Sequence, residues 1–248
     1  MERWQNRVAC VTGASSGIGA AIAKDLVNAG LIVVGLARRT ERMEEICGSL
    51  PQNLQSRLHG VKCDVTSEQS VNEAFDWIEQ HLGGVDVLIN NAGTHVSGQL
   101  LTMETSALQQ TMQTNVMGMV YCTRRAFVSM QKRNIGDGHV VLINSILGHT
   151  IFQRSPGLVS HLNMYPVTKY GVTALAEILR QEFWDLETKI KITSLSPGVV
   201  DTDIVPDNFR HLPKLKAEDI SAGVMYILAT PPHVQVHELI IKPLGEPF

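Results

Sequence analysis

A tyrosine and a lysine four positions apart form the pair of side chains best suited to move a proton in this chain. Within a helix, Tyr165 and Lys169 would lie on one face, one turn apart. A free tyrosine has a pKa of about 10, and a nearby positive charge lowers that pKa by favouring the phenolate. The pair is therefore typical of a general acid or base with its activator. A solvated helix face gives the same spacing by chance, so other residues must support this interpretation.

A glycine-rich segment near the N-terminus is suited to binding phosphate. The run Gly-Ala-Ser-Ser-Gly-Ile-Gly follows an apolar run and leads into a helical pattern. Glycines permit a tight turn and let the backbone approach a pyrophosphate, and the next helix N-terminus supplies free N–H groups. Glycine also serves ordinary turns, but the position between the first strand and the first helix favours a nucleotide site. The expected contacts are Gly13, Ser15, Ser16, Gly17, Ile18 and Gly19.

The end of the second expected strand indicates which dinucleotide would bind. An NAD site usually places an acidic residue here, on the adenosine ribose, but Ala37 stands at this position. Arg38 and Arg39 follow, and a guanidinium pairs with a phosphate and stacks on adenine. Two basic residues are unfavourable at a helix N-terminus, which argues against a merely solvated helix start. We therefore expect NADP(H) rather than NAD(H).

Two further strand ends contribute candidate cofactor contacts. Asp64 and Val65 come directly after the third expected strand. The Asp64 carboxylate either caps the next helix or accepts a hydrogen bond from the adenine amine, and the residues alone leave both roles open. The fourth expected strand ends in small residues where a cofactor would pass over the sheet, and the expected contacts there are Asn91, Ala92 and Gly93.

The elements that must position these residues alternate along the chain. Several runs rich in Val, Ile and Leu lack polar alternation, as in a parallel sheet covered on both faces. The alternation predicts an α/β fold, a Rossmann-type doubly wound parallel sheet of about seven strands with helices on both faces. The expected strands are 7–12, 31–36, 57–63, 85–89, 139–144, 190–196 and 239–242. The expected helices are 17–29, 41–49, 67–81, 104–132, 165–186 and 216–228.

The organisation of the chain favours one domain. No internal repeat, linker or low-complexity stretch interrupts residues 1–248. We expect a nucleotide-binding half over roughly residues 1–145 and a catalytic and substrate half over roughly residues 145–248. Ligands of such sheets bind beyond the carboxyl ends of the strands, and each motif above follows such an end or lies on the next helix.

The composition excludes several classes of protein. A formal charge of -3 argues against nucleic-acid binding, which needs a basic excess. No apolar run reaches the roughly 18 residues needed to span a bilayer, and the polar first seven residues do not resemble a signal peptide. The four cysteines have no Cys-x-x-Cys spacing, which favours reduced thiols and a cytoplasmic protein. No cluster of side chains has metal-ligand spacing, so no metal is expected.

Taken together, these motifs resemble those of the short-chain dehydrogenase/reductase family over essentially the whole chain. Several matches in one order are far more specific than any single motif. The resemblance implies an oxidoreductase with a nicotinamide cofactor, in which the tyrosine–lysine pair is catalytic. The matching residues, in the family's order, are 13–19, 90–93, Asn115, Ser145, Tyr165 with Lys169, and Pro197 with Gly198.

The resemblance implies four catalytic residues, of which Ser145 and Tyr165 would contact the substrate. Tyr165 would be the general acid in reduction and the base in oxidation. Lys169 would lower the pKa of the tyrosine and hydrogen-bond the nicotinamide ribose. Ser145 would orient the substrate oxygen and stabilise developing negative charge. Asn115 would hold a water that links Lys169 to solvent, and because asparagine is a poor residue inside a helix, its place within the expected helix 104–132 needs a reason.

After the sixth expected strand, the family's backbone meets the nicotinamide carboxamide, and a threonine binds that group or the phosphates. The corresponding contacts would be Pro197, Gly198, Val200 and Thr202. The chain further resembles a subgroup with insect NADP-dependent farnesol dehydrogenases and a vertebrate cytosolic keto-steroid reductase. Members of this subgroup act on bulky apolar alcohols and ketones, such as terpenols and steroids. This likeness rests on residues 1–4, the long connection 145–165, and segments 171–175 and 196–200.

The connection between Ser145 and Tyr165 carries apolar side chains that would line a lipophilic pocket, pack a subunit interface or pack the loop itself. They are Ile151, Phe152, Leu158, Val159, Leu162 and Met164. Segment 205–215 lies where the family's substrate lid lies. Because Tyr165 already supplies the acid, three histidines are interpreted as surface or loop residues. These are His95, His149 and His161.

The expected assembly is a homodimer or a homotetramer. Many family members assemble through the last strand and through the fourth and fifth helices. Residues 234–243 lack the glycine turn and the Gly-Gly pair that often flank that strand. A dimer through the helices is therefore expected, and a tetramer through the terminal strand is left open.

The leading hypothesis is an NADP(H)-dependent alcohol dehydrogenase or carbonyl reductase acting on a lipophilic alcohol or carbonyl, with an isoprenoid alcohol such as farnesol as the first candidate. The alternative within enzymes is a broad carbonyl or keto-steroid reductase. An NADPH-binding regulatory protein is disfavoured, because the set Asn115, Ser145, Tyr165 and Lys169 is intact. A methyltransferase also uses a glycine-rich turn, but it does not need the tyrosine–lysine pair or the paired arginines.

Overall fold

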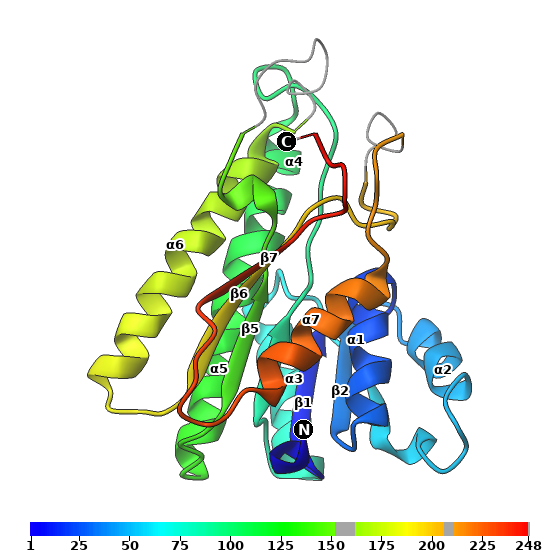
Figure 1. Cartoon of the computed structure of the whole chain (residues 1–248), viewed down its shortest axis with the longest axis vertical. Coiled ribbons are helices and arrows are strands. Elements are labelled where there is room, and N and C mark those ends of the chain that lie inside the picture. Colours follow the sequence, from blue (N-terminus) through cyan, green and yellow to red (C-terminus); the bar gives the residue numbers. More distant parts are fainter. Residues whose placement is uncertain (152–161, 206–210, 248) are drawn as a thin grey trace.

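The computed structural model describes residues 1–151, 162–205 and 211–247 (Figure 1). Within these ranges, seven strands form one parallel sheet in the order β3-β2-β1-β4-β5-β6-β7. This order confirms the predicted Rossmann-type doubly wound sheet. The strands are β1 (Val8–Thr12), β2 (Ile32–Ala37), β3 (Leu58–Lys62), β4 (Val87–Asn90), β5 (His139–Ile143), β6 (Lys191–Pro197) and β7 (Glu238–Ile241).

The helices lie between the strands, as the crossovers of a parallel sheet require. All but one of the predicted helices begin and end within two residues of their expected bounds. The main helices are α1 (Gly17–Asn28), α2 (Glu41–Gly48), α3 (Glu68–Leu82), α4 (Thr105–Met112), α5 (Gly118–Lys132), α6 (Met164–Asp185) and α7 (Ala217–Ala229). Single turns are η1 (Glu2–Trp4), η2 (Gln55–Arg57), η3 (Gln113–Met117) and η4 (Ile146–Gly148).

The two faces of the sheet bury their apolar side chains against different helices. Successive residues of a strand point to opposite faces. In β1, Ala9 and Val11 pack in a core with residues of α1 and α7, which lie side by side in Figure 1. Val8 and Cys10 of the same strand pack in a second core with residues of α3, α5 and α6. Burial on both faces explains why the strand sequences are apolar throughout.

One predicted helix proved to be interrupted. The expected helix 104–132 consists of α4, the π-helical turn η3 and α5. Asn115 lies within this π-helical turn. A π-helical turn adds one residue to the helix and often marks a functional site. Because α4, η3 and α5 follow one another without an intervening loop, the segment was interpreted as one continuous helix.

The loops that follow the strands all lie at one end of the sheet, the end at which the parallel strands finish. In Figure 1 this end of the sheet faces the top of the view, where the C-terminus lies, while the N-terminus lies at the bottom. Among the described residues, no helix has the length and apolar content needed to cross a membrane. The site described next occupies the loop end.

Candidate active site

A cavity of about 880 Å³ opens at the carboxyl ends of the strands. Loops that follow β1, β2, β3, β4, β5 and β6 all contribute to its walls, together with α6. Gly19 and Asn115, by contrast, lie outside the cavity lining. The other predicted site residues all line the cavity: Gly13, Ser15, Ser16, Gly17, Ile18, Arg38, Arg39, Asp64, Val65, Asn91, Ala92, Gly93, Ser145, Tyr165, Lys169, Pro197, Gly198, Val200 and Thr202.

Gly19 packs against the glycine-rich turn without lining the cavity. A Cβ atom at this position would lie 2.4 Å from the Gly13 carbonyl oxygen and 2.5 Å from Asn91 Nδ2. Asn91 Nδ2 itself donates to the carbonyl oxygens of Thr12 (2.9 Å) and Gly13 (3.2 Å). The absence of a side chain at Gly19 therefore lets α1 pack directly against the turn. The structure thus gives Gly19 a role in shaping the turn, and its contact with the cofactor stays a prediction.

The start of α1 suits an anionic group. Ser16 is the N-cap residue, and its side chain accepts no hydrogen bond from the first turn. The N–H groups of a helix's first turn have no partner within the helix, and the helix dipole adds a partial positive charge. Thr202 reaches over this point, because its methyl carbon would lie 3.1 Å from a Cβ atom at Gly17. These features fit the phosphates of a dinucleotide.

Charged side chains mark the part of the cavity beside β2 and β3. Arg38 and Arg39 follow β2, and both are exposed and line the cavity. Asp64 does not cap the next helix, because Ser67 is the N-cap residue of α3 and its side chain accepts from Ser70 N. One Asp64 carboxylate oxygen instead accepts from the backbone N–H and the hydroxyl of Thr66, at 3.0 and 2.8 Å. The capping alternative for Asp64 is therefore wrong.

Ser145, Tyr165 and Lys169 meet where β5 ends beside α6. The Ser145 hydroxyl accepts a hydrogen bond from Leu147 N at 3.1 Å and forms a hydrogen bond with the Tyr165 phenol. Lys169 Nζ donates to the carbonyl oxygen of Ile143 at 2.9 Å. The same ammonium group lies 5.5 Å from the centroid of the Tyr165 ring. The tyrosine and the lysine thus share one helix face, as their spacing predicted.

Burial controls the protonation of the tyrosine and the lysine. It raises the pKa of Tyr165 to about 12, and the hydrogen bond with Ser145 acts in the opposite direction. It also lowers the pKa of Lys169 to about 8. At neutral pH the phenol therefore holds its proton and the ammonium keeps its charge. Burial outweighs the expected lowering of the tyrosine pKa, and the group that does lower it is Ser145.

Asn115 braces two elements that border the cavity. Its side chain is fully buried, accepts from Thr94 N at 2.8 Å and donates to Thr94 O at 3.0 Å. Asn115 Nδ2 also donates to the hydroxyl of Thr168, at 3.1 Å, and Thr168 directly precedes Lys169. The side chain thus connects the loop after β4 to α6. This bracing gives a structural reason for an asparagine at the π-helical turn, while the water relay stays a prediction.

His95 was missed as a site residue. It lies two positions after Gly93, lines the cavity and packs edge-on against the Tyr165 ring, with 5.5 Å between ring centroids. The sequence interpretation set it aside because Tyr165 already supplied an acid. The available signal was its position just past the carboxyl end of β4, where side chains enter the site.

The other two histidines and the apolar connection have separate outcomes. His149 lies in a loop, as expected, but is half-buried, with Nε2 3.0 Å from Ser196 Oγ and 2.7 Å from Glu238 Oε1. Leu162 is buried and lines the cavity, whereas Ile151 is exposed. His161, Phe152, Leu158, Val159 and residues 206–210 of the expected lid lie outside the described residues.

The arrangement suits hydride transfer with a dinucleotide. Among the described residues, no group of three or more His, Cys, Asp or Glu side chains could hold a metal ion. The cavity instead runs from the glycine-rich turn and the arginines to the Ser145–Tyr165–Lys169 group. A phenol that keeps its proton beside a serine hydroxyl can donate to an oxygen that gains electrons.

Comparisons with known proteins agree with this geometry. Residues 7–212 match the model of the family described as short chain dehydrogenase. The chain is 50% identical to a farnesol dehydrogenase of Aedes aegypti over the full length of both chains. It is 40% identical to the human dehydrogenase/reductase SDR family member 11, covering 98% of this chain and 96% of the relative. An alcohol dehydrogenase of Thermococcus sibiricus, solved in complex with 5-hydroxy-NADP, superposes with a TM-score of 0.83 at 26% identity, covering 98% of each chain.

Proposed function

Because the chain belongs to the short-chain dehydrogenase/reductase family, we propose that it is an NADP(H)-dependent oxidoreductase for lipophilic alcohols or carbonyls. The observation that carries the proposal is the meeting of Ser145, Tyr165 and Lys169 in a cavity that also contains the glycine-rich turn. An isoprenoid alcohol such as farnesol is the first candidate substrate.

The catalytic step needs a proton on the substrate's carbonyl oxygen. A bound nicotinamide would supply or accept the hydride. In reduction, the Tyr165 phenol donates its proton to the carbonyl oxygen while the Ser145 hydroxyl hydrogen-bonds that oxygen. Burial and Ser145 set the pKa of Tyr165 before the reaction, and the Lys169 ammonium, 5.5 Å from the ring centroid, would attract the negative charge that develops as the phenol gives up its proton. In oxidation of an alcohol, the same groups act in reverse.

The cofactor residues divide along the cavity. The turn at residues 13–19 and the start of α1 would hold the phosphates, and Thr202, which lies beside Gly17, would border them. Arg38 and Arg39 stand at the adenosine end, where a guanidinium suits a 2′-phosphate. The backbone after β6, which lines the cavity, would border the nicotinamide. The NADP derivative in the Thermococcus sibiricus alcohol dehydrogenase supports a phosphorylated cofactor.

Lipophilic side chains support an apolar substrate. Ile146, Leu147 and Leu162 form a small buried cluster against which Tyr165, Val205 and Leu212 pack. Its three buried members and Val205 line the cavity near the catalytic tyrosine. The 50% identity of this chain to the farnesol dehydrogenase from Aedes aegypti supports an isoprenoid alcohol as its substrate, ahead of a keto-steroid or a small carbonyl.

The decisive experiment is a turnover screen of the purified protein. Farnesol, geraniol, aliphatic aldehydes and keto-steroids are each offered with NADP(H) and with NAD(H). We expect turnover of an isoprenoid alcohol with NADP, and a loss of at least about a hundredfold in Tyr165→Phe, because general acid–base catalysis contributes about 10²- to 10⁴-fold. Normal turnover of Tyr165→Phe would refute the catalytic assignment. Binding of NADPH without turnover of any compound would favour the regulatory alternative.

Cofactor choice has its own test. Arg38→Ala is expected to raise the KM for NADP much more than the KM for NAD, because the guanidinium would pair with the additional phosphate. Arg42→Ala is a matched control, since Arg42 lies on α2 outside the cavity lining. An equal rise in KM for NADP and for NAD in Arg38→Ala would refute the proposal that Arg38 selects NADP.

Assembly and location complete the proposal. We place the enzyme in the cytoplasm as a homodimer or a homotetramer. Large apolar side chains on one helix support an interface there, because exposed apolar groups often mark contact surfaces. On α6, these are Val167, Tyr170, Ile178 and Trp184.

A further inference from the structure

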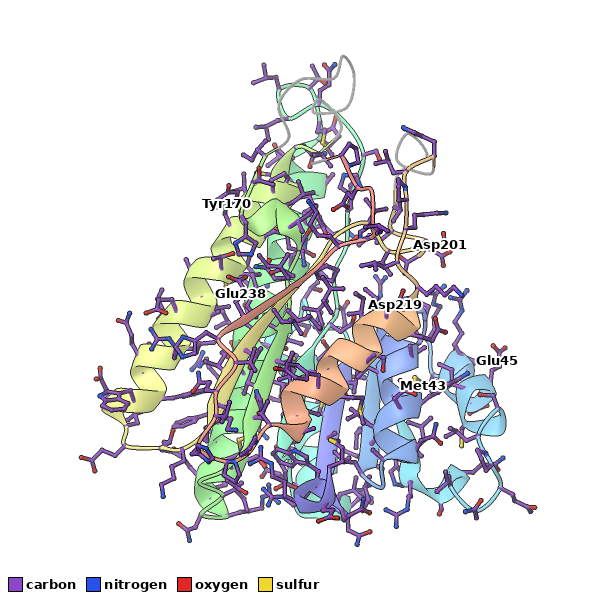
Figure 2. All side chains as sticks on the ribbon, viewed as in Figure 1. Met43, Glu45, Tyr170, Asp201, Asp219 and Glu238 are labelled. Carbon is purple, nitrogen blue, oxygen red and sulfur yellow. The ribbon has the colours of Figure 1, made fainter. Side chains whose placement is uncertain are left out.

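The C-terminal segment folds over the loop that follows β6. After β7, the chain makes a turn in which Glu246 N donates to the Pro243 carbonyl oxygen at 3.2 Å. Figure 1 shows this red segment passing beside the loop after β6, and Figure 2 labels Asp201 on that loop. Two segments separated by more than forty residues therefore lie against each other at the edge of the cavity.

Glu246 makes the central contact between these segments. Its side chain is 0% exposed, and Oε1 accepts a hydrogen bond from Val199 N at 2.9 Å. Oε2 lies 3.4 Å from Nζ of Lys242, four residues earlier in the same segment. A buried carboxylate is costly unless it is paired and hydrogen-bonded. The Val199 N–H hydrogen-bonds Oε1 and the Lys242 ammonium offsets the negative charge, whereas Oε2 accepts no hydrogen bond from any described residue.

Gly198 makes room for this carboxylate. A Cβ atom at position 198 would lie 2.6 Å from Glu246 Oε1 and 2.9 Å from Pro243 Cδ. Any side chain larger than a hydrogen atom would therefore displace the tail. Gly198 N also donates to the Ile241 carbonyl oxygen at 2.8 Å, so the end of β7 and the tail hold consecutive residues of the loop.

The loop is fixed on its opposite side as well. The Val199 carbonyl oxygen accepts from Leu215 N at 2.8 Å, and Asp201 N donates to the Leu215 carbonyl oxygen at 2.8 Å. Both backbone groups of Val199 are thus engaged, one by Glu246 and the other by Leu215. Gly198 and Val199 line the cavity, whereas Glu246 does not. Glu246 can act on a bound molecule only through this backbone.

We propose that Glu246 is a positioning residue that holds the 197–200 backbone in the shape that binds the nicotinamide end of the dinucleotide. The proposal rests on the proposed function, because it assumes a nicotinamide cofactor in this cavity. The C-terminal tail is then part of the cofactor site, although it touches neither the cofactor nor the substrate.

The test compares Glu246→Ala, Glu246→Gln and Glu246→Asp in the full-length chain. The dissociation constant of NADPH is measured by fluorescence titration, alongside KM, kcat and the melting temperature. Glu246→Ala is expected to weaken NADPH binding about tenfold, because hydrogen bonds to charged groups are among the stronger ones. Glu246→Gln keeps the acceptor atom and should stay within about threefold of the parent. Glu246→Asp is too short to reach Val199 N and should resemble Glu246→Ala.

Controls separate positioning from a general loss of structure. Leu244→Ala lies in the same tail at a fully exposed position and should leave NADPH affinity unchanged. Lys242→Met removes the charge partner but leaves the hydrogen bond to Val199 N, so its effect should be smaller than that of Glu246→Ala. If Glu246→Ala yields too little folded protein, the contrast between Gln and Asp carries the test.

The outcomes distinguish this inference from the proposed function. If the parent protein binds no NADPH, the proposed function fails, and this inference fails with it. If the parent binds NADPH and Glu246→Ala and Glu246→Asp bind it equally well, only the role of Glu246 is overturned. A lower melting temperature with unchanged NADPH affinity would also overturn it, because the residue would then be purely structural.

Discussion

The two ends of the parallel sheet both bury titratable side chains, but they surround them differently. At the carboxyl end, the half-buried Tyr165 and the buried Lys169 face a cavity of about 880 Å³. At the amino end, Asp86, His139 and Lys191 are buried against other protein groups. The first arrangement leaves space for another molecule, whereas the second uses its polar groups to hold the fold together.

The amino end shows how protein partners satisfy buried charges. Asp86 accepts from Val8 N at 2.8 Å and lies 2.8 Å from Arg133 and 3.2 Å from Arg7. Lys191 Nζ donates to the Pro231 and Val234 carbonyl oxygens. These contacts join the starts of three strands to α5 and to the segment after α7. Their role is stability.

A perturbed pKa does not by itself distinguish the two ends. Burial lowers the pKa of His139 to about 3, with Lys191 and Arg3 acting in the same direction, and that of Lys169 to about 8. The histidine at the structural end is shifted further from its ordinary value than the lysine at the catalytic end. Perturbed groups indicate function only when they also line a cavity.

The largest effect is expected for Lys169→Met at the carboxyl end. Loss of the ammonium should lower kcat/KM by about 10²- to 10⁴-fold, since the phenolate loses its stabilising charge. The same variant should unfold at higher urea concentration at pH 7. With a pKa of about 8 in the fold against 10.5 in the open chain, burial of the charged lysine costs roughly 3 kcal/mol.

The sign follows from linkage. The unfolded chain binds the Lys169 proton more tightly, so stability falls as the pH drops from 10.5 to about 8, and the whole cost is present below pH 8. Lys169→Met removes this cost, although it also removes the hydrogen bond to Ile143 O. A variant that lost both activity and stability would contradict the assignment of this end to function.

The next effect is expected for Asp86→Ala at the amino end. Removing one partner from a buried ion pair costs about 3–5 kcal/mol, and because both arginines keep about a quarter of their exposure we expect the lower limit. The free energy of unfolding is measured by urea denaturation. Asp76→Ala is the matched control, because this partner of Arg125 is 56% exposed and such pairs contribute about 1 kcal/mol or less. The kcat/KM of folded Asp86→Ala should match the parent, and a selective loss of activity would break the comparison.

A smaller effect concerns the pH dependence of stability. Because His139 has a pKa of about 3 in the fold and 6.5 in the open chain, its contribution is complete above pH 6.5 and declines toward pH 3. The expected loss is roughly 2 kcal/mol at pH 5. His139→Gln should flatten urea midpoints between pH 7 and pH 5, and exposed His233→Gln is the control. Equal slopes in His139→Gln and the parent would show that another group controls the acid response.

The smallest effect is expected at His95, beside the catalytic tyrosine. His95→Phe keeps an aromatic ring against Tyr165, so its kcat should stay within about threefold of the parent. His95→Ala loses the ring contact, and aromatic pairs contribute about 0.5–1.5 kcal/mol, so its kcat should fall about three- to tenfold. Equal losses in both variants would mean that the imidazole nitrogens, rather than the ring contact, support catalysis.

Several features followed from the sequence because they depend on local patterns. Apolar runs located the strands, and helical periodicity located the helices. The glycine-rich turn and the pair Tyr165 and Lys169 also lay where they were expected. These predictions succeeded because backbone hydrogen bonding and side-chain direction repeat at fixed spacings. The π-helical turn at Asn115 was not predicted, since it joins α4 directly to α5 and no loop marks it in the sequence.

The sequence by itself determined the order of the elements, the family and the identity of the groups that can hold phosphate or move a proton. Only the tertiary structure decided which distant residues meet these groups. It placed His95 against Tyr165, turned Asp64 away from capping α3, and brought Glu246 onto Val199 N. Such contacts depend on strand order and on how loops pack, and no local spacing encodes either. Their effect on protonation is equally non-local, because burial by the assembled fold sets the pKa values of Tyr165 and Lys169.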